Sequence, residues 1–467
     1  MRALYKLIVL ASATTVFACS LEPDLPRLVA LEPQQTIRVV HASTLDLEAG
    51  TWITGTTVLA RRGEIVWLGP DAEAPAAVET ELRVDATGKY MIPGLVDAHT
   101  HLISNGAPPW SKRLGNIQRS LDTFLYSGVT SIFDLGGLRG QIYDVRDSVQ
   151  NGEREGPSLW VAGAHFTATG GHPVALLEEF VPWFLRWYLR REFAYYANDP
   201  AQAQQAVNEW VDEGGDILKL TLDDIPSGVP KLQEATIRAL VEAGHERNVP
   251  VIAHVGEPSD AVTVIAAGVD GLAHTPYDGL FSPEQMETVR SRPLYAMSTI
   301  HVWRTVLELD ANQPDITPLA EKLFDPVALL AVRNRPADFS MPADFQGWIA
   351  HLKEHRNDVV NNVRTLYAAG VTIVAATDSP GVGIIGGEAL HREMRTLVKQ
   401  AELSTLDALR GATIHPARLM QVDDQVGSLA VGKNADWLLL GSDPLADIAA
   451  TESIEQIVLQ GRVVRRL

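Results

Sequence analysis

Two histidines close together after an apolar run are the residues of this sequence that first suggest chemistry. His99 and His101 lie in the stretch GLVDAHTHL, residues 94–102, which continues a run that begins MIPG. Alternate residues of a β-strand point to the same face, so both imidazoles would be presented together. Imidazole nitrogens bind Zn²⁺ and related metals, although two polar residues at the end of a strand need not bind anything. The pair therefore raises a metal site as a hypothesis that the rest of the chain has to decide.

Four more ionisable residues follow apolar runs further along the chain. They are Lys219 in DILKL, His254 in VIAHVG, His274 in GLAHTP and Asp378 in VAATDSP. Each has an ordinary alternative, since a strand-end histidine is often only hydrogen-bonded, an aspartate can cap a turn and a lysine can reach solvent. If the runs are parallel strands of one barrel, however, all six side chains converge at one opening. Four imidazoles, a carboxylate and a lysine in this order predict a metal centre.

The apolar runs recur through the middle of the chain and alternate with segments of helical period. The eight runs are MIPGLVDAHTHL, VTSIFDLG, PSLWVAGAHFT, GDILKLTL, VPVIAHVG, DGLAHTP, LYAMSTIHVW and VTIVAATDSP. They are almost continuously apolar, which is typical of parallel strands covered on both faces. Eight strand–helix alternations over residues 91–420 predict an α/β fold, a (β/α)₈ barrel of the TIM type. The stretch ALRGATIHPARLM is expected to be its last helix.

Both ends of the chain have a different texture, with short β-rich segments separated by turns. Residues 37–90 contain IRVVHAS, WITGTTVLARRG, EIVWLG and ELRVDAT, and residues 421–467 contain GSLAVGKNADWLLLG and IEQIVLQGRVVRRL. The simplest arrangement is one small β-sandwich domain built from both ends, with the barrel inserted between them. Residues 19–36 hold three prolines and little pattern, which indicates a tether.

The first 18 residues have the features of a secretory signal peptide. Arg2 and Lys6 precede an apolar stretch that is too short to span a bilayer. Cys19, the only cysteine of the chain, follows at once, as in bacterial lipoprotein signals where this residue is lipidated. Phe17 departs from the small residue usual in that signal, so cleavage without lipidation is the alternative. We expect an exported protein of the periplasm or cell envelope that is held at the membrane through Cys19.

The net charge of −19 argues against nucleic acid as a partner, because a phosphate backbone requires a basic surface. The charge suits a protein that repels its neighbours in solution, and it does not indicate a substrate.

Together these motifs resemble the amidohydrolase superfamily, and its prolidase- and imidazolonepropionase-like branch in particular. The resemblance covers nearly the whole chain after the signal and rests on IPGLVDAHTHL, the ordered strand-end residues, GATIHPARLM and VGSLAVGKNADWLLLGSDPL. It implies a hydrolase with two divalent metal ions, most simply Zn²⁺, bridged by Lys219 carrying CO₂ as a carbamate (N6-carboxylation). One metal would be held by His99, His101 and Asp378, and the other by His254 and His274. The resemblance also makes Asp378 catalytic, passing a proton from the metal-activated water to the leaving nitrogen.

Two further histidines are predicted to bind the substrate. His172 follows two glycines in TATGGHP, residues 167–173, where the backbone can approach a ligand closely, although this could be a simple turn. His301, just past the seventh strand, is the second. The resemblance implies a glycine-rich loop after Lys219 in dipeptidases, but this chain has TLDDIPSGVP. Its Asp223 and Asp224 either disfavour a substrate carboxylate or only cap the loop.

The segment FVPWFLRWYLRREFAYY, residues 180–196, combines aromatic residues with arginines. Such a segment could be a lid lining a pocket for an apolar substrate, could rest on a membrane interface, or could simply pack on the barrel.

We therefore expect a metal-dependent hydrolase that cleaves an amide C–N bond, in an Xaa-Pro-like dipeptide or an N-acyl amino acid. A cyclic amide, as in imidazolonepropionase, or an ester or lactone are the alternatives, because the same site can attack all of them. A metal- or solute-binding envelope lipoprotein is the alternative without turnover, and Asp378 argues against it because a binder has no use for a proton shuttle.

Overall fold

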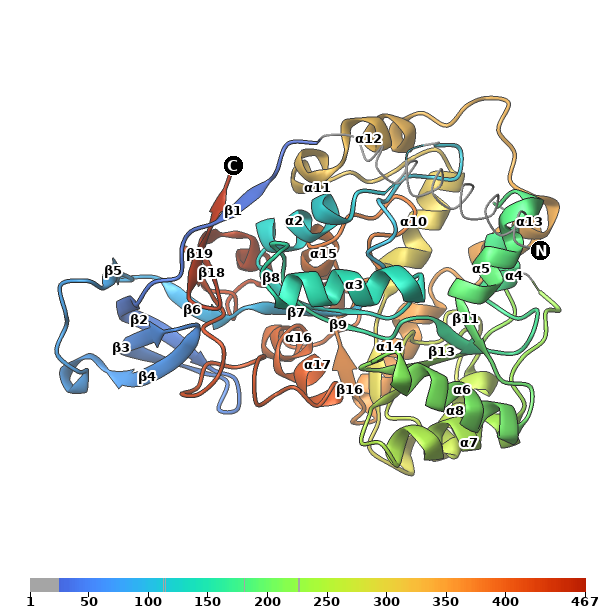
Figure 1. Ribbon diagram of the computed structural model, residues 1–467, viewed down its shortest axis with the longest axis horizontal. Coiled ribbons are helices and arrows are strands. Elements are labelled where there is room, and N and C mark those ends of the chain that lie inside the picture. The colour runs from blue at the N-terminus through green and yellow to red at the C-terminus, as the bar shows by residue number, and fades with distance from the viewer. Residues whose placement is uncertain (1–24, 112, 114, 180, 226) are drawn as a thin grey trace, which may run out of the picture.

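The structure is a computed structural model that describes residues 25–467 except 112, 114, 180 and 226. The predicted signal peptide, Cys19 and the first part of the predicted tether lie outside the described residues. Within the described part, every helix is too short or too polar to cross a membrane. A sheet built from both chain ends lies on one side of the molecule and an α/β barrel on the other (Figure 1).

All eight predicted barrel strands are present and parallel. They are β7 (Leu95–Thr100), β8 (Val129–Asp134), β9 (Ser158–Val161) continued by β10 (His165–Thr167), β12 (Leu218–Leu222), β13 (Val251–Val255), β14 (Gly271–Leu272), β15 (Tyr295–Met297) and β16 (Thr372–Val374). The strands pair in chain order, and a parallel bridge between Thr100 and Ser379 joins the first strand to the segment after the last. A short extra strand, β11 (Ala194–Tyr196), pairs with β10. The fold is the predicted (β/α)₈ barrel.

The third barrel strand is broken at Gly163. Its φ of +75° is a conformation that glycine adopts readily, and a Cβ there would lie 2.1 Å from the Tyr143 hydroxyl oxygen. The break lets β9 pair with β8 while β10 pairs with β12.

Helices cover the outside of the barrel between the strands. They are α2 (Ile117–Tyr126), α3 (Arg139–Gln150), α6 (Pro200–Asp212), α7 (Glu234–His245), α8 (Pro258–Ala267), α9 (Pro283–Arg290), α10 (Ile300–Asp310), α14 (Asp358–Ala368) and α15 (Glu388–Lys399). Further helices lie in the long connections after the third and seventh strands: α4 (Val174–Glu178), the 3₁₀ turn η2 (Trp183–Leu185), α5 (Arg186–Glu192), α11 (Pro318–Leu323), α12 (Pro326–Arg333) and α13 (Ala343–Glu354).

The expected last helix is two helices, α16 (Thr405–Gly411) and α17 (Ile414–Leu419). The carbonyl of Gly411 accepts a hydrogen bond from the N–H of Ala375, and that of Ala412 accepts one from Val96. These carbonyls therefore bond to barrel strands rather than to the next helical turn, which ends the first helix. Side chains of the second helix join the core inside the barrel.

The terminal sheet combines strands from both chain ends in the order β1-β19-β18-β17-β6-β2-β3-β4, with β5 paired to β2. The strands are β1 (Val29–Leu31), β2 (Ile37–Asp46), β3 (Thr51–Arg61), β4 (Glu64–Pro70), β5 (Leu82–Asp85), β6 (Tyr90–Pro93), β17 (Trp437–Leu440), β18 (Ile454–Leu459) and β19 (Arg462–Arg466), and the 3₁₀ turns η1 (Asp71–Glu73) and η3 (Ile448–Glu452) lie in the connections. Residues of β2, β3, β6 and β17 share one hydrophobic core, as expected for a sandwich. One correction concerns the predicted tether: Val29–Leu31 is a strand, because Val29 is buried and the segment pairs with β19.

Candidate metal centre

The six predicted metal ligands meet at the carboxyl ends of the barrel strands. His101 Nε2 lies 2.9 Å and His99 Nε2 3.4 Å from the same oxygen of Asp378. Lys219 Nζ lies 3.3 Å from His99 Nε2. The ring of His274 lies between two other rings, with centroids 4.6 Å from His99 and 4.4 Å from His254. Strands one, four, five, six and eight thus bring all six side chains into one cluster.

Each of the four histidines uses one ring nitrogen to bond a protein group. The contacts are His99 Nδ1 with the Ala273 carbonyl (2.9 Å), His101 Nδ1 with the Gly136 carbonyl (2.7 Å), His274 Nδ1 with Thr299 Oγ1 (2.8 Å) and His254 Nε2 with Asp223 Oδ2 (3.0 Å). In metal sites such outer contacts fix the ring orientation and leave the second nitrogen for the metal. Donor atoms of His99, His274 and Asp378 all lie within 4.8 Å of one another.

Lys219 is fully buried among these histidines. Burial lowers its pKa to about 7, against the opposing effects of Asp378 and Asp134. A substantial fraction of neutral amine is therefore present near neutral pH, and the neutral form is the one that can react with CO₂.

Asp378 is ionised, although burial by itself raises the pKa of a carboxyl group. Interactions with His99, His101 and Lys219 outweigh burial and hold its pKa well below the usual range. Asp378 and Thr299, the partner of His274, adopt φ of +59° and +41°. Non-glycine residues rarely adopt this conformation, and such residues cluster at functional sites. Oriented imidazoles, an ionised carboxylate and a buried amine together fit divalent metals.

His165, at the end of the third strand, is a member of this site that the sequence reasoning missed. It is buried, its Nδ1 bonds Thr221 Oγ1 at 3.0 Å, and its ring centroid lies 6.2 Å from that of His101. A Cβ on Gly136 would come within 2.1 Å of His165 Nε2, so glycine is needed there. The signal was present, because His165 is the first ionisable residue after the apolar start of its run.

Two buried aspartates bond the chain next to the candidate ligands His101 and Asp378. Asp97 accepts a hydrogen bond of 2.6 Å from the Thr377 hydroxyl, which ties β7 to the segment that carries Asp378. Asp134 accepts one of 2.7 Å from the N–H of Leu102, the residue after His101. Burial raises the pKa of Asp97 to about 7 and that of Asp134 to about 6.

His172 lies beside the cluster, as its predicted substrate role requires. It is buried, its Nδ1 contacts the Ile225 carbonyl at 2.9 Å, and its ring centroid is 4.9 Å from that of His254. Burial and the nearby His254 lower its pKa to about 4, so the ring is neutral.

His301, the other predicted substrate residue, contacts helix α15 in the structure, and its substrate role stays a prediction. Glu393 of α15 accepts hydrogen bonds from the backbone N–H groups of Ile300 and His301, at 2.8 and 3.1 Å. The His301 ring also bonds Thr396 of the same helix. Trp303, further along α10, lies near the cluster, with its ring centroid 5.3 Å from that of His274.

The two aspartates after Lys219 have different partners. Asp223 is buried against His254 and also accepts a hydrogen bond from the Tyr277 hydroxyl at 3.1 Å. Asp224 accepts one from the N–H of Gly228 and pairs with Lys231, so it caps the loop.

The aromatic segment after His172 lies largely at the surface. Trp183 is 81% exposed and Trp187 59%, whereas Leu189 and Phe193 are buried and anchor the segment beside α4. The exposed aromatic side chains are therefore not part of a closed lid in this structure.

The barrel and the site indicate a metal-dependent hydrolase, and comparison with known proteins agrees with this class. Residues 90–464 match the amidohydrolase family, and the chain belongs to this family. It is 24% identical to an imidazolonepropionase from Cupriavidus pinatubonensis, over 90% of this chain and 91% of that protein. It is 22% identical to an ochratoxinase from Aspergillus niger, over 91% and 85% of the two chains.

Solved structures share the fold. A Xaa-Pro dipeptidase with bound methionine superposes with a TM-score of 0.70, at 20% identity and over 92% of this chain and 99% of that one. The Aspergillus niger ochratoxinase gives a TM-score of 0.68, at 18% identity and over 92% and 96%.

Proposed function

We propose that this protein is a binuclear metal hydrolase that cleaves the amide C–N bond of a dipeptide or an N-acyl amino acid. The observation that carries the proposal is the orientation of the four histidines. Each has one nitrogen held by the protein, and the four rings form one cluster with Lys219 and the ionised Asp378. Membership of the amidohydrolase family supports hydrolysis in general.

Each residue of the candidate site has a proposed role. His99, His101 and Asp378 would hold one divalent metal, His254 and His274 the other, and Lys219, carboxylated at its amine, would bridge them. When bound, two such metals lower the pKa of a water and polarise a carbonyl group. Asp378, ionised and in contact with two imidazoles, can accept the proton from the attacking water and deliver it to the leaving nitrogen. Neutral His172, beside His254, can orient the substrate through a hydrogen bond to its carbonyl or carboxylate.

A hydrolysis screen of the purified, metal-loaded protein tests this proposal. Dipeptides with carboxyl-terminal proline and N-acyl amino acids should be turned over, with two metal ions per chain by elemental analysis. Tight metal binding with no turnover across amides and esters would overturn the enzyme and favour a metal-binding protein.

Cyclic amides and lactones are the alternative substrates, because imidazolonepropionases are among the relatives. Cyclic amides and lactones therefore belong in the same screen. Turnover of these rings alone, without linear amides, would select this alternative over the amidase.

We also propose that the protein is exported and anchored to the membrane through lipidated Cys19. The basic start, the short apolar stretch and the single cysteine directly after it support this localisation.

A further inference from the structure

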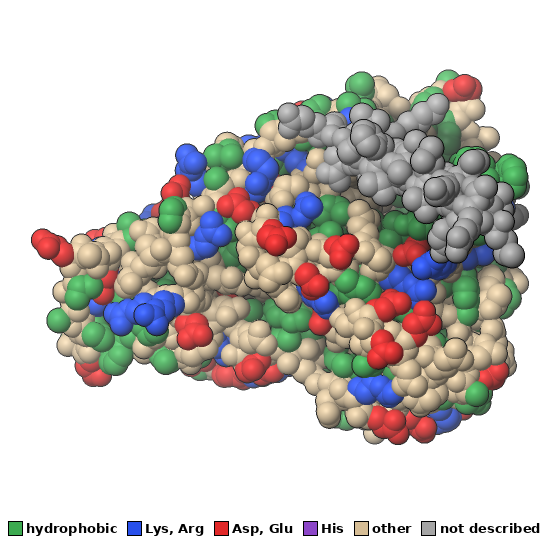
Figure 2. Space-filling model, viewed as in Figure 1, with side chains coloured by type: hydrophobic (Ala, Val, Ile, Leu, Met, Phe, Trp, Pro, Cys, Tyr) green, Lys and Arg blue, Asp and Glu red, His purple; other side chains and the backbone are tan. Residues whose placement is uncertain are grey.

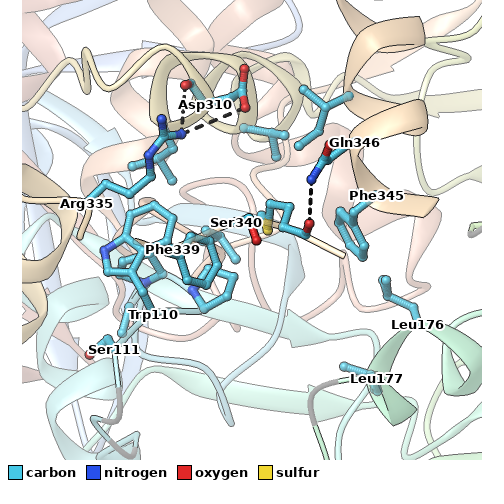
Figure 3. A pocket seen from close by; sticks show the side chains of 18 of the residues that line it. Trp110, Ser111, Leu176, Leu177, Asp310, Arg335, Phe339, Ser340, Phe345 and Gln346 are labelled. Carbon is cyan, nitrogen blue, oxygen red and sulfur yellow. Dashed lines mark hydrogen bonds and ion pairs between the residues drawn. The ribbon is translucent and has the colours of Figure 1, made fainter. Parts of the chain in front are cut away.

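A large groove lies on the same end of the barrel as the metal ligands. Its volume is about 760 Å³, and its walls come from the connection after β7, from α4, α10 and α13, and from the loop after β16 (Figure 3). The walls are mainly apolar: Trp110 and Phe339 pack edge to face at 5.0 Å on one side, and Leu177 and Phe345 lie on the other. No residue of the metal cluster lines the groove itself.

The wall of the groove lies close along the chain to two of the proposed metal ligands, His101 and Asp378. Asn105 of the groove wall lies four residues after His101, and Val382 lies four residues after Asp378. Four residues span at most about 14 Å, so the groove begins within that distance of both ligands. The N–H of Gly383 donates a hydrogen bond of 2.8 Å to the Gly106 carbonyl, which holds these two loops together.

The charged groups at the edge of the groove are already paired. Arg335 bonds the Asp310 carbonyl at 2.9 Å, Lys353 pairs with the Asp310 carboxylate at 2.6 Å, and Arg113 pairs with Asp325 at 2.5 Å. The Trp110 N–H donates to a backbone carbonyl at 2.8 Å. The groove therefore offers apolar surface rather than unpaired charge, which selects a neutral, apolar ligand group.

We propose that this groove binds the acyl group of an N-acyl amino acid, and that the preferred acyl group is a long aliphatic chain. This inference rests on the proposed function and narrows its substrate class. A volume of about 760 Å³ is in the range that buries a drug-sized ligand, well beyond what the side chain of a small dipeptide fills. The amide carbonyl would lie at the metal ligands and the chain would extend between Trp110 and Phe345.

A chain-length series tests the inference. The substrates are N-acetyl-, N-butanoyl-, N-octanoyl- and N-dodecanoyl-proline, with the phenylalanine series in parallel, on the metal-loaded full protein. Burial of each added methylene should raise kcat/KM by up to about fourfold until the groove is full. A kcat/KM that is independent of chain length would overturn the inference and leave the amidase proposal standing.

A steric variant with a matched control localises the effect. Ala350 is exposed on α13 and lines the groove, so Ala350→Trp should narrow it. The ratio of kcat/KM for dodecanoyl over acetyl substrates should fall at least tenfold. Glu354→Trp, on the same helix but outside the groove, should retain the full advantage. Equal effects of the two variants would contradict the location.

Binding measured without turnover separates the two proposals. N-dodecyl-proline, which has no amide carbonyl, should bind the wild-type protein in a calorimetric titration and bind at least tenfold more weakly to Ala350→Trp. If it does so while no N-acyl amino acid is hydrolysed, the groove is supported and the proposed reaction fails. If it binds both proteins equally, the groove is not the site of the chain.

Discussion

At the scale of single residues, the centre depends on the groups that hold each ligand as much as on the ligands. His99 and His101 are oriented by backbone carbonyls of Ala273 and Gly136, whereas His254 depends on the carboxylate of Asp223. A carboxylate can be removed by substitution and a carbonyl cannot, which makes Asp223 the accessible test of ligand orientation.

Asp223→Ala should weaken metal binding without removing a ligand. Loss of such an outer partner typically costs 10- to 100-fold in metal affinity, because the ring loses its orientation and basicity. Competition with a chromophoric chelator measures the change, and thermal unfolding without metal checks that the variant is folded.

Asp224→Ala is the matched control, because Asp224 is adjacent and contacts the loop and Lys231 instead of a histidine. Equal metal affinities of the two variants would show that Asp223 does not orient His254.

Lys219→Ala should lose both metal and activity if the lysine carries a bridging carbamate. Short carboxylic acids such as acetate or propionate should partly restore both, since they can occupy the space and supply the missing anion. Metal analysis and the hydrolysis rate are the measurements, with Lys89→Ala, which removes a half-buried lysine of the sheet domain, as control. Full metal content and rate in Lys219→Ala would refute the bridge.

At the scale of elements, buried aspartates near the ends of strands tie these strands to other segments. In the barrel, the pairing of β7 with β8 shifts register between Asp97 and Thr100, and Asp97 bonds Thr377 beyond β16. In the sheet domain, the buried aspartate is Asp436, which precedes β17. One of its oxygens accepts a 2.6 Å hydrogen bond from the N–H of Gln460, and the other is buried with no partner among the described residues.

The Asp436 carboxyl should make stability depend on pH. Burial raises its pKa from 3.8 to about 7, so the folded protein binds this proton more tightly than the unfolded chain. The tighter proton binding by Asp436 stabilises the folded protein fully below about pH 4, and this stabilisation is lost as the pH rises through about 7. Relative to Asp436→Asn, the wild-type protein should lose on the order of 4 kcal/mol of unfolding free energy over that range.

Urea unfolding of both proteins at several pH values measures this difference. Asp424→Asn, which removes an exposed carboxyl from the same part of the chain, should show no such pH-dependent difference from the wild type. A constant difference between wild type and Asp436→Asn across the pH range would contradict the assignment.

At the scale of the whole molecule, the acidic chain keeps both signs of charge on its surface. Figure 2 shows acidic and basic side chains interspersed over one face, without a large basic patch there. That nucleic acid is not a partner stays a prediction from the net charge of −19. In the proposed localisation, the lipid at Cys19 attaches the protein to the membrane.

Cys19→Ala should release the protein from the membrane fraction of cells that process lipoproteins. Fractionation and detergent partitioning measure the change, and metal-dependent hydrolysis by the released protein should be unaffected, because Cys19 precedes the folded domains. Unchanged partitioning of the variant would remove the lipoprotein proposal.

Local features of the sequence were enough to predict the eight strands, their order and the convergence of the six candidate ligands. These follow from local features: apolar runs of strand length, the two-residue repeat of a strand, and the rule that parallel strands of a barrel end at one opening. The same local signal is present at His165. The strand Val29–Leu31 could not be found this way, because its pairing partner β19 is more than 400 residues away.

Tertiary structure alone decided which nitrogen of each histidine is held by the protein, since Ala273 is 174 residues from His99. It also placed His301 against α15, where the Glu393 carboxylate accepts hydrogen bonds from the backbone N–H groups of Ile300 and His301. The apolar groove is likewise assembled from four distant connections. Such features depend on contacts between segments remote in the chain, and the local pattern of residues carries no information about those contacts.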